Sequence, residues 1–212
     1  MSGIAEIFDA QLNPGKEEVA RIYGGLNTLL GSYRLVDTVD GEVGIEVLIG
    51  RDIDNRLVQM PLSYRPAELA PEHTLTEIEH SVLGRRWVSN ALGDPVAVRE
   101  FIRTILTGDD GATYSNGTTP LVDIRGAGSY YAPEARIGEV KLEEVTRQRA
   151  VGTVVINDLV RSFVLRLPGI LGEKKSSGVD YDAARMHLRG TSEEAPEKVL
   201  RVAELFWRDM ER

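Results

Sequence analysis

The chain has 212 residues, 42% apolar and 27% charged, which is typical of a globular protein with a hydrophobic core. Its net charge of −8 is uneven, because residues 1–110 hold 18 acidic and 10 basic side chains whereas residues 111–212 hold 15 of each. Such a surface repels phosphate backbones and anionic lipids, so we expect neither nucleic acid nor a membrane as partner, and the absence of cysteine excludes disulfides, thiolate metal sites and cysteine nucleophiles.

Residues 1–18 have neither the basic start nor the long apolar stretch of a signal peptide. No apolar run approaches the roughly 20 residues that cross a bilayer. We therefore expect a cytoplasmic protein.

The first half of the chain predicts a short helix over residues 16–26, followed by strands. Asp40-Gly41 supplies the turn of a hairpin between the first two strands, because both residue types tolerate positive φ. A second hairpin follows a Pro- and Glu-rich loop over 65–74. The predicted strands are 32–38, 43–50, 56–64, 76–82 and 85–90.

Residues 95–107 predict an amphipathic helix with one buried face. Asp94 is placed to accept from a first-turn N–H, and Pro95 suits the first helical position. Gly108 marks the end. The apolar stripe comprises Val98, Phe101, Ile102 and Ile105.

The second half begins after a glycine-rich segment, residues 107–119, whose composition indicates a flexible loop. We expect strands over 121–126, 137–145, 152–158 and 161–169, then a loop over 172–190 with at most one helical turn. The chain closes with a predicted helix over 192–212. Its apolar stripe comprises Val199, Leu200, Ala203, Phe206, Trp207 and Met210.

A faint internal repeat links the halves. YRLV, GIEVLI and LVQMPL resemble VKLE, GTVVI and FVLRLP at offsets of 106 to 108 residues. Shared β-branched patterning is the alternative explanation. We expect an α+β fold of one or two curved antiparallel sheets backed by helices. The first domain spans 1–107, a flexible loop spans 108–119, and a β-rich part spans 120–212, either as a separate part or packed as one unit with the first.

Three motifs stand in a recognisable order: GEVGIEVLIG, then LVQMPLSYRPAEL, then EIEHSVLGRRWVSNALGDPVAVREFI. In this order they resemble the maltokinase N-terminal cap-like proteins of actinobacteria, over about residues 20–107. The resemblance implies a cystatin-like first half, a curved sheet holding a helix, and a setting in glucan or trehalose–maltose metabolism. Ser89-Asn90 departs from the family's Tyr-Asp and removes a charge, which puts any binding role of that acid in doubt.

The sequence argues against two activities that relatives suggest. Phosphoryl transfer needs a phosphate-cradling loop, metal-binding acids and a base, and no kinase or phosphate-loop motif occurs. A glucan-branching enzyme needs a large barrel with paired carboxylates. We expect neither activity.

Glu79, His80 and Ser81 look like a catalytic trio. On a strand, however, Glu79 and Ser81 point to one face and His80 to the other, so adjacency argues against a triad. They remain candidate ligand-binding residues.

Arg85 and Trp87 project together on the next strand. An arginine beside an indole forms a platform for a sugar or an anion, or it covers the edge of a core. We favour the second interpretation, with both side chains packed against Phe101 and Ile105.

Other candidates are weaker. Phe206 and Trp207 could dock a partner from the terminal helix, or simply cover a sheet. The three histidines lack metal-site spacing, and residues 107–119 lack the calcium-loop pattern, so we expect no metal and no cofactor.

Three hypotheses for function follow. The favoured one is a non-enzymatic binding, accessory or regulatory module, whose partner is a carbohydrate or a glucan-pathway enzyme. The second is a small-molecule enzyme that uses Glu79 or His80 as acid–base in a pocket of the sheet. The third is a homodimer formed through the terminal helix.

Overall fold

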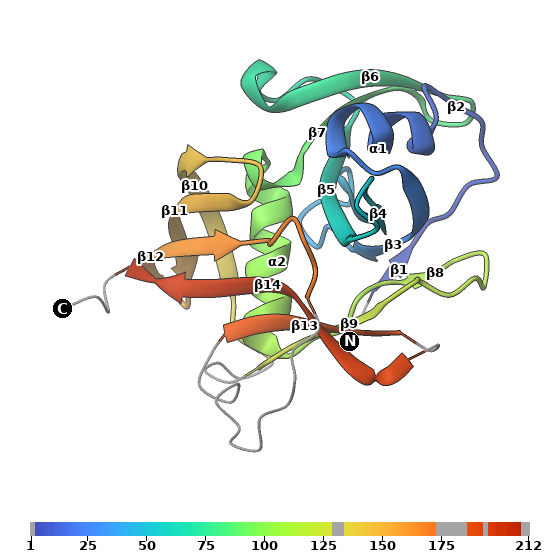
Figure 1. The fold of residues 1–212 in the computed structure, drawn as a ribbon. Coiled ribbons are helices and arrows are strands. Elements are labelled where there is room, and N and C mark those ends of the chain that lie inside the picture. The colour runs from blue at the N-terminus through green and yellow to red at the C-terminus, as the bar shows by residue number, and fades with distance from the viewer. Residues whose placement is uncertain (1–2, 129–133, 173–185, 193–194, 209–212) are drawn as a thin grey trace.

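The computed structural model describes residues 3–128, 134–172, 186–192 and 195–208. Within them lie two six-stranded antiparallel sheets, two α-helices and a small parallel pair (Figure 1). The first sheet has the order β2 (Leu12–Asn13), β6 (Thr74–His80), β7 (Gly84–Asn90), β5 (Leu57–Arg65), β4 (Gly44–Arg51) and β3 (Thr28–Leu35). The second has the order β10 (Ile137–Val145), β11 (Arg149–Ile156), β12 (Leu159–Arg166), β14 (Ala195–Trp207), β13 (Met186–Ser192) and β9 (Asp123–Gly126). The remaining elements are α1 (Lys16–Gly24), α2 (Pro95–Thr107), the pair β1 (Ile4–Ala5) and β8 (Thr113–Tyr114), and the 3-10 turns η1 (Pro71–His73) and η2 (Ala91–Gly93).

The two sheets have the same connectivity. In each, three consecutive strands form a meander and the next two form a hairpin beside it. The strand that comes first in the sequence of that sheet, β2 or β9, adds to the hairpin. The register agrees as well: Tyr33 faces Val47 in the first sheet, and Val140 faces Val154, each 107 positions later, in the second. Of the expected one or two antiparallel sheets, the structure has two, in a β-rich fold with two α-helices.

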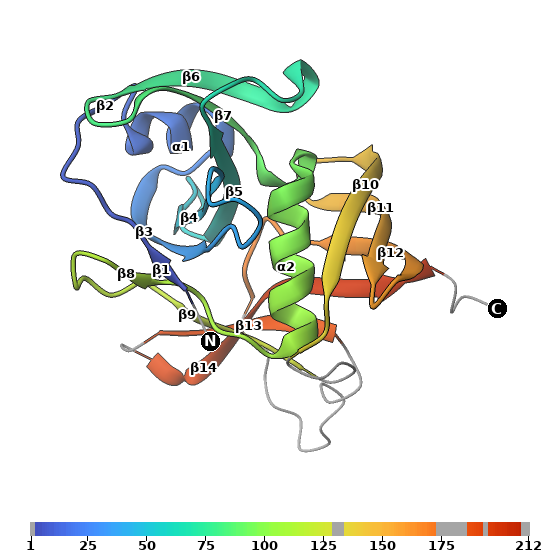
Figure 2. The same cartoon turned by 180° about the vertical axis from the view of Figure 1, so that it is seen from behind.

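Helix α2 forms as predicted. Asp94 Oδ1 accepts from the Val96 N–H at 3.0 Å, Pro95 occupies the first turn, and Gly108 ends the helix with a φ of 72°. We expected α2 to back the first sheet alone, but it lies between the two sheets and contacts both (Figures 1 and 2).

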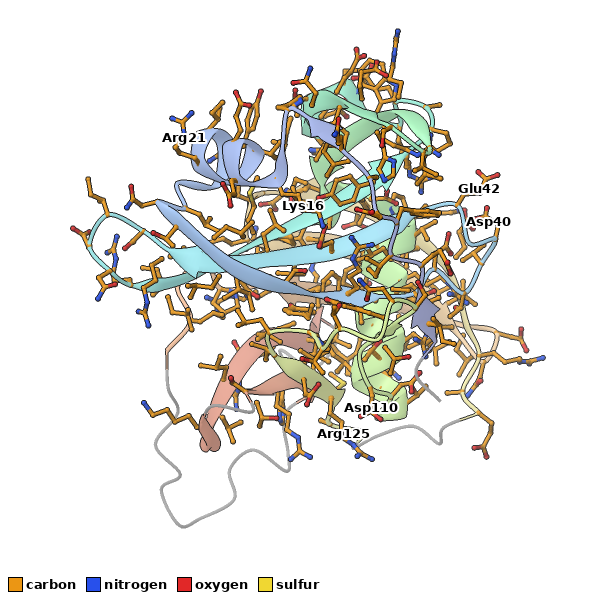
Figure 3. All side chains as sticks on the ribbon, turned by 90° about the vertical axis from the view of Figure 1, so that its right-hand side faces the viewer. Lys16, Arg21, Asp40, Glu42, Asp110 and Arg125 are labelled. Atoms are coloured by element: carbon orange, nitrogen blue, oxygen red, sulfur yellow. The ribbon has the colours of Figure 1, made fainter. Side chains whose placement is uncertain are left out.

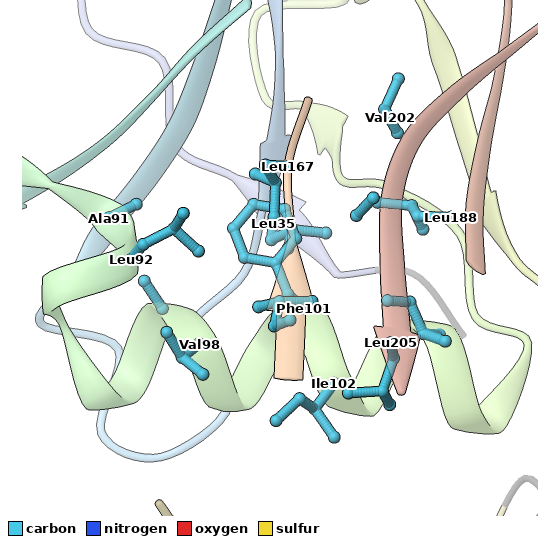
Figure 4. Packing of buried hydrophobic residues seen from close by; sticks show 14 of the residues in the cluster. Leu35, Ala91, Leu92, Val98, Phe101, Ile102, Leu167, Leu188, Val202 and Leu205 are labelled. Carbon is cyan, nitrogen blue, oxygen red and sulfur yellow. The ribbon is translucent and has the colours of Figure 1, made fainter. Parts of the chain in front are cut away.

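This position buries more than one face of α2. The predicted stripe packs into a core that takes residues from both halves of the chain, including Leu35, Leu188 and Leu205 (Figure 4). Glu100 and Thr104, outside that stripe, are also buried. A boundary at residue 107 would separate α2 from the second sheet on which it packs.

Gln59 ties the two halves together. Its Nε2 donates to the carbonyl oxygens of Pro168 and Val202, both at 2.8 Å, and its Oε1 accepts from the Tyr33 hydroxyl at 3.3 Å. Asn90 makes a similar link, because its amide donates to the Thr146 carbonyl at 3.0 Å. An aspartate at position 90 could not donate this bond.

The predicted terminal helix is wrong, since residues 195–207 form the 13-residue strand β14. Leu188 pairs with Ala203 but Arg189 pairs with Arg201, so Val202 is an extra residue, a β-bulge. The bulge places Val202 and Ala203 next to each other in the core and interrupts the period of two, which lets the sequence imitate a helical stripe. Met210 lies outside the described residues.

Two loop predictions are also revised. Strand β13 starts at Met186 inside the segment predicted as loop, of which residues 173–185 lie outside the described part. The segment 107–119 contains β8, which pairs with β1. A partner strand only two residues long leaves no periodic pattern in the sequence.

Two matched substitutions distinguish the strand from the helix. Val202 is fully buried whereas Val199 is 38% exposed, the reverse of what the helical stripe requires. We expect Val202→Ala to lower the free energy of unfolding by about 1.5–3 kcal/mol, from lost burial and a cavity. Val199→Ala should change it by less than about 0.5 kcal/mol. Urea denaturation measures both, and a larger loss for Val199→Ala would contradict the strand.

Candidate functional site

A cavity of about 760 Å³ opens on the face of the first sheet that carries α1. Helix α1 is only nine residues long, about 13 Å, so it covers part of this face. Beneath it lies an apolar cluster that includes Leu48, Leu62 and Val88. The cavity occupies the remainder of the face, where the polar side chains Arg34, Glu46, Tyr64, His80 and Arg86 replace the apolar ones.

The N-terminal segment, residues 4–12, forms one wall of the cavity. It is held at one end by β1 on β8 and at the other by β2 on β6. Ser81 secures the second end, because its Oγ accepts from Gln11 N at 3.0 Å and its N–H donates to Gln11 O at 3.0 Å. Ser81 therefore has a positioning contact with this segment.

Glu46 is the centre of the site. Its side chain is 1% exposed, and Oε1 accepts from Lys16 Nζ at 2.8 Å and Ser32 Oγ at 2.7 Å. Arg34 Nη2 lies 3.3 Å from the same oxygen. The second oxygen accepts from the Tyr64 hydroxyl at 3.2 Å. Four side chains from three elements, α1, β3 and β5, thus converge on one carboxylate.

The cluster fixes the charge of Glu46. Burial alone would raise its pKa, but Arg34 and Lys16 outweigh this effect and hold the pKa below its ordinary value. Burial and the Glu46 charge raise the pKa of Tyr64 well above its ordinary value. Glu46 is therefore an anion and Tyr64 a neutral hydrogen-bond donor at neutral pH.

His80 reaches the same cavity. Its Nδ1 accepts from the N–H groups of Val82 at 3.2 Å and Leu83 at 3.1 Å, so the neutral ring carries its proton on Nε2. Partial burial and then the charge of Arg86 lower the pKa of His80. Phe8 meets the ring edge-on at 5.7 Å. At neutral pH His80 is thus an uncharged donor.

Glu79, Arg85 and Trp87 lie on the opposite face of the hairpin. Glu79 faces Arg85 and Glu77 faces Trp87 across the strand pair, and Arg85 forms exposed ion pairs with both glutamates, at 3.7 Å and 3.4 Å. Glu79 and His80 therefore share no pocket, as the alternation predicted.

The packing expected for Arg85 and Trp87 is not observed. Phe101 belongs to the core around α2, and Trp87 is not among the residues packed against that core. Arg85 is 61% exposed. Trp87 lies on the face opposite Val88, and its cross-strand neighbours there are the charged residues Glu77 and Arg65.

Phe206 and Trp207 do not form one docking face. As neighbours on β14 they point to opposite sides: Trp207 pairs with Phe163 and is 7% exposed, and Phe206 pairs with Val164. The Arg161 guanidinium lies 5.0 Å from the centre of the Trp207 ring. The homodimer hypothesis required a terminal helix as the interface. Residues 195–207 instead form β14, which lies between β12 and β13 within the sheet.

A second cavity, of about 640 Å³, is lined by residues that include Asp110, Arg125 and Arg189. Figure 3 shows Lys16 on one side of β3 and the pair Asp110 and Arg125 on the other. That pair is separated by 3.7 Å, and its side chains are 52% and 60% exposed. The buried Glu46 cluster makes the first cavity the stronger candidate site.

The sequence did contain a signal for Glu46. It is a carboxylate within the apolar run GIEVLI, where burial of an unpaired charge is very costly. Lys16, Arg34 and Arg86 gave no such signal, since charged residues on a helix or strand are ordinarily solvated. Only the strand order brings them together.

Comparison with known proteins places this site in a recognised region. Residues 21–94 match the maltokinase N-terminal cap domain, which confirms the resemblance over that segment. The segment contributes Arg34, Glu46, Tyr64, His80 and Arg86 to the cavity. No curated protein matches the chain. The described residues contain no group of three or more potential metal ligands and no helix long and apolar enough to span a membrane.

Replacement of Glu46 by glutamine tests the cluster. We expect Glu46→Gln to cost about 3 kcal/mol at pH 7, the low end for a broken buried pair, because Lys16 and Arg34 keep some contact with water. The folded-state pKa of Glu46 is lowered, so its contribution is present above the unfolded pKa of about 4.3 and is lost as pH falls through the folded pKa. In urea denaturation, the difference between wild type and variant should therefore shrink below about pH 4.

The matched control is Glu42→Gln, at an exposed position on the rim of the same cavity. It should change the free energy of unfolding by less than about 0.5 kcal/mol. A difference for Glu46→Gln that is equally large at both pH values would contradict a charge-based role.

Proposed function

We propose that this cap-like protein is a non-catalytic module that binds a small carbohydrate in the cavity of the first sheet. In this role it would serve, as an accessory or regulatory protein, an enzyme of maltose–trehalose or glucan metabolism. The metabolic setting is supported by the match of residues 21–94 to the maltokinase cap domain.

The observation that carries the proposal is the composition of the cavity. Its volume of about 760 Å³ lies within the range of small-molecule sites, roughly 300–1,000 Å³. Polar donors around Glu46 face apolar walls formed by Phe8, Leu12 and Leu83. A sugar presents both hydroxyl groups and apolar C–H faces, and such a mixed lining is suited to both.

The state of the titratable groups supports binding rather than catalysis. A general base must have a lone pair free to take a proton from the substrate. Glu46 is buried and already accepts three hydrogen bonds, with Arg34 at ion-pair distance. The Nδ1 of His80 is occupied by two backbone N–H groups. Both groups are well placed to orient donors and poorly placed to transfer protons.

Two aromatic substitutions distinguish sugar binding in the cavity from sugar binding at the exposed Arg85–Trp87 surface. Maltose, trehalose, glucose and short maltooligosaccharides are tested by thermal denaturation and calorimetry. At ten times Kd, binding adds about 1.4 kcal/mol and raises Tm by about 3–6 °C. Phe8→Ala, in the cavity wall, should weaken the binding at least about tenfold, whereas Trp87→Ala, on the opposite face, should leave Kd unchanged.

The opposite pattern, loss with Trp87→Ala alone, would assign the sugar to the Arg85–Trp87 surface and refute the cavity. Absence of any Tm shift at millimolar sugar would refute carbohydrate binding itself. Both variants are first compared with wild type without ligand, so that a change in stability is separated from a change in affinity.

A further inference from the structure

We propose that the ligand of this cavity carries an oxyanion, a phosphate or carboxylate group on the sugar, and that Arg86 binds that group. Only the sugar part of this ligand rests on the proposed function; the oxyanion part is argued independently. It names the chemical class that the cavity selects and the residue that selects it.

The first argument is that the cavity offers hydrogen-bond donors. Lys16, Arg34 and Arg86 carry only N–H donors, and the free ring nitrogen of His80 is protonated. The Tyr64 hydroxyl already donates its hydrogen bond to Glu46 and is not free to donate to a ligand. A surface made mainly of donors matches a ligand group made entirely of acceptors, and phosphate and carboxylate are such groups.

The second argument concerns the acids that line the same space. Glu46 is saturated by the donors described above. The Asp37 carboxylate accepts from the backbone N–H groups of Val39 at 2.8 Å and Val43 at 3.1 Å. Glu6 and Glu42 are exposed at the rim, where water screens their charges. None of the four is an ion-pair partner of Arg86.

Arg86 is therefore the uncompensated cation of the cavity. Within the described residues, its guanidinium forms no ion pair, and its one side-chain hydrogen bond goes from Nη1 to the Arg85 carbonyl at 2.9 Å. By contrast, Lys16 and Arg34 share Glu46. Three cations face two buried carboxylates, Glu46 and Asp37, which leaves one positive charge. That excess matches the single charge of a carboxylate and offsets part of the charge of about −1.5 to −2 on a phosphate monoester at pH 7.

The orientation of Arg86 follows from the sheet. It lies directly across from Ile78 on β6 and shares its face with Val88 on β7, so the strand alternation directs it into the cavity. Arg85, one residue earlier, points to the opposite face and is paired with Glu77 and Glu79. The two neighbouring arginines thus form a matched pair that differs in the face each occupies.

The test compares Arg86→Gln with the control Arg85→Gln. Calorimetry and thermal denaturation are run with glucose 6-phosphate, glucuronate, glucose and inorganic phosphate. In the wild type we expect an anionic sugar to bind at least about tenfold more tightly than glucose, because charge-assisted hydrogen bonds add to the sugar contacts. Arg86→Gln should abolish this preference, Arg86→Lys should retain part of it, and Arg85→Gln should retain it fully.

The two sugar anions separate the possible sources of the oxyanion: preference for glucose 6-phosphate supports a phosphate, and preference for glucuronate supports a carboxylate. Equal Kd values for glucose and both anions, or equal losses in the two glutamine variants, would overturn the inference while sugar binding stands. Arg86-dependent binding of inorganic phosphate without any contribution from the sugar would support the oxyanion and refute the carbohydrate. The Tm of each ligand-free variant shows that it is folded.

Discussion

The burial of helix α2 between two sheets is the constraint on which the rest of the structure depends. Its apolar stripe packs against strands of both halves in one continuous core. The side that would normally face solvent is buried as well, and there Glu100 accepts from Thr38 Oγ1 at 2.7 Å and from Arg103 Nε at 2.6 Å, with Arg99 also paired to it. Because α2 needs both sheets, the first sheet must give one of its faces to this core.

That requirement determines where a ligand can bind. The other face of the first sheet is left to α1, which is too short to cover it, and the uncovered part becomes the cavity. Glu46 stands at the border between the covered and uncovered parts. Removing a carboxylate from water costs several kcal/mol unless donors replace the water. Lys16, the first residue of α1, supplies one of these donors, so the ion cluster also sets the position of α1 and hence the shape of the site.

Local signals in the sequence predicted the elements whose patterns are uninterrupted. Asp94 and Gly108 bracket α2, and the period of two recovered the strands of the first meander. The pattern failed at β14, where a single extra residue, Val202, converts an alternating strand into an apparent helix. The sequence did not predict the candidate site, and the reason is different. Lys16 and Arg86 are 70 positions apart, and only the strand order, which places β7 beside β5, brings them to one cavity. The alternation of Glu79 and His80 was predicted correctly because it depends on the strand alone.

The shared strand order explains why one sheet has this site and the other does not. The pair Arg34 and Glu46 of the first sheet corresponds in register to Lys141 and Thr153 of the second. Both sheets turn the equivalent faces toward α2, so these two pairs lie on the faces away from it. In the second sheet that face has no covering helix among the described residues, and a buried carboxylate there would find no enclosure and no donor comparable to Lys16. Threonine at position 153 needs neither. The site therefore depends on what the first half adds to the common plan: a helix between β2 and β3 and a carboxylate beneath its first turn.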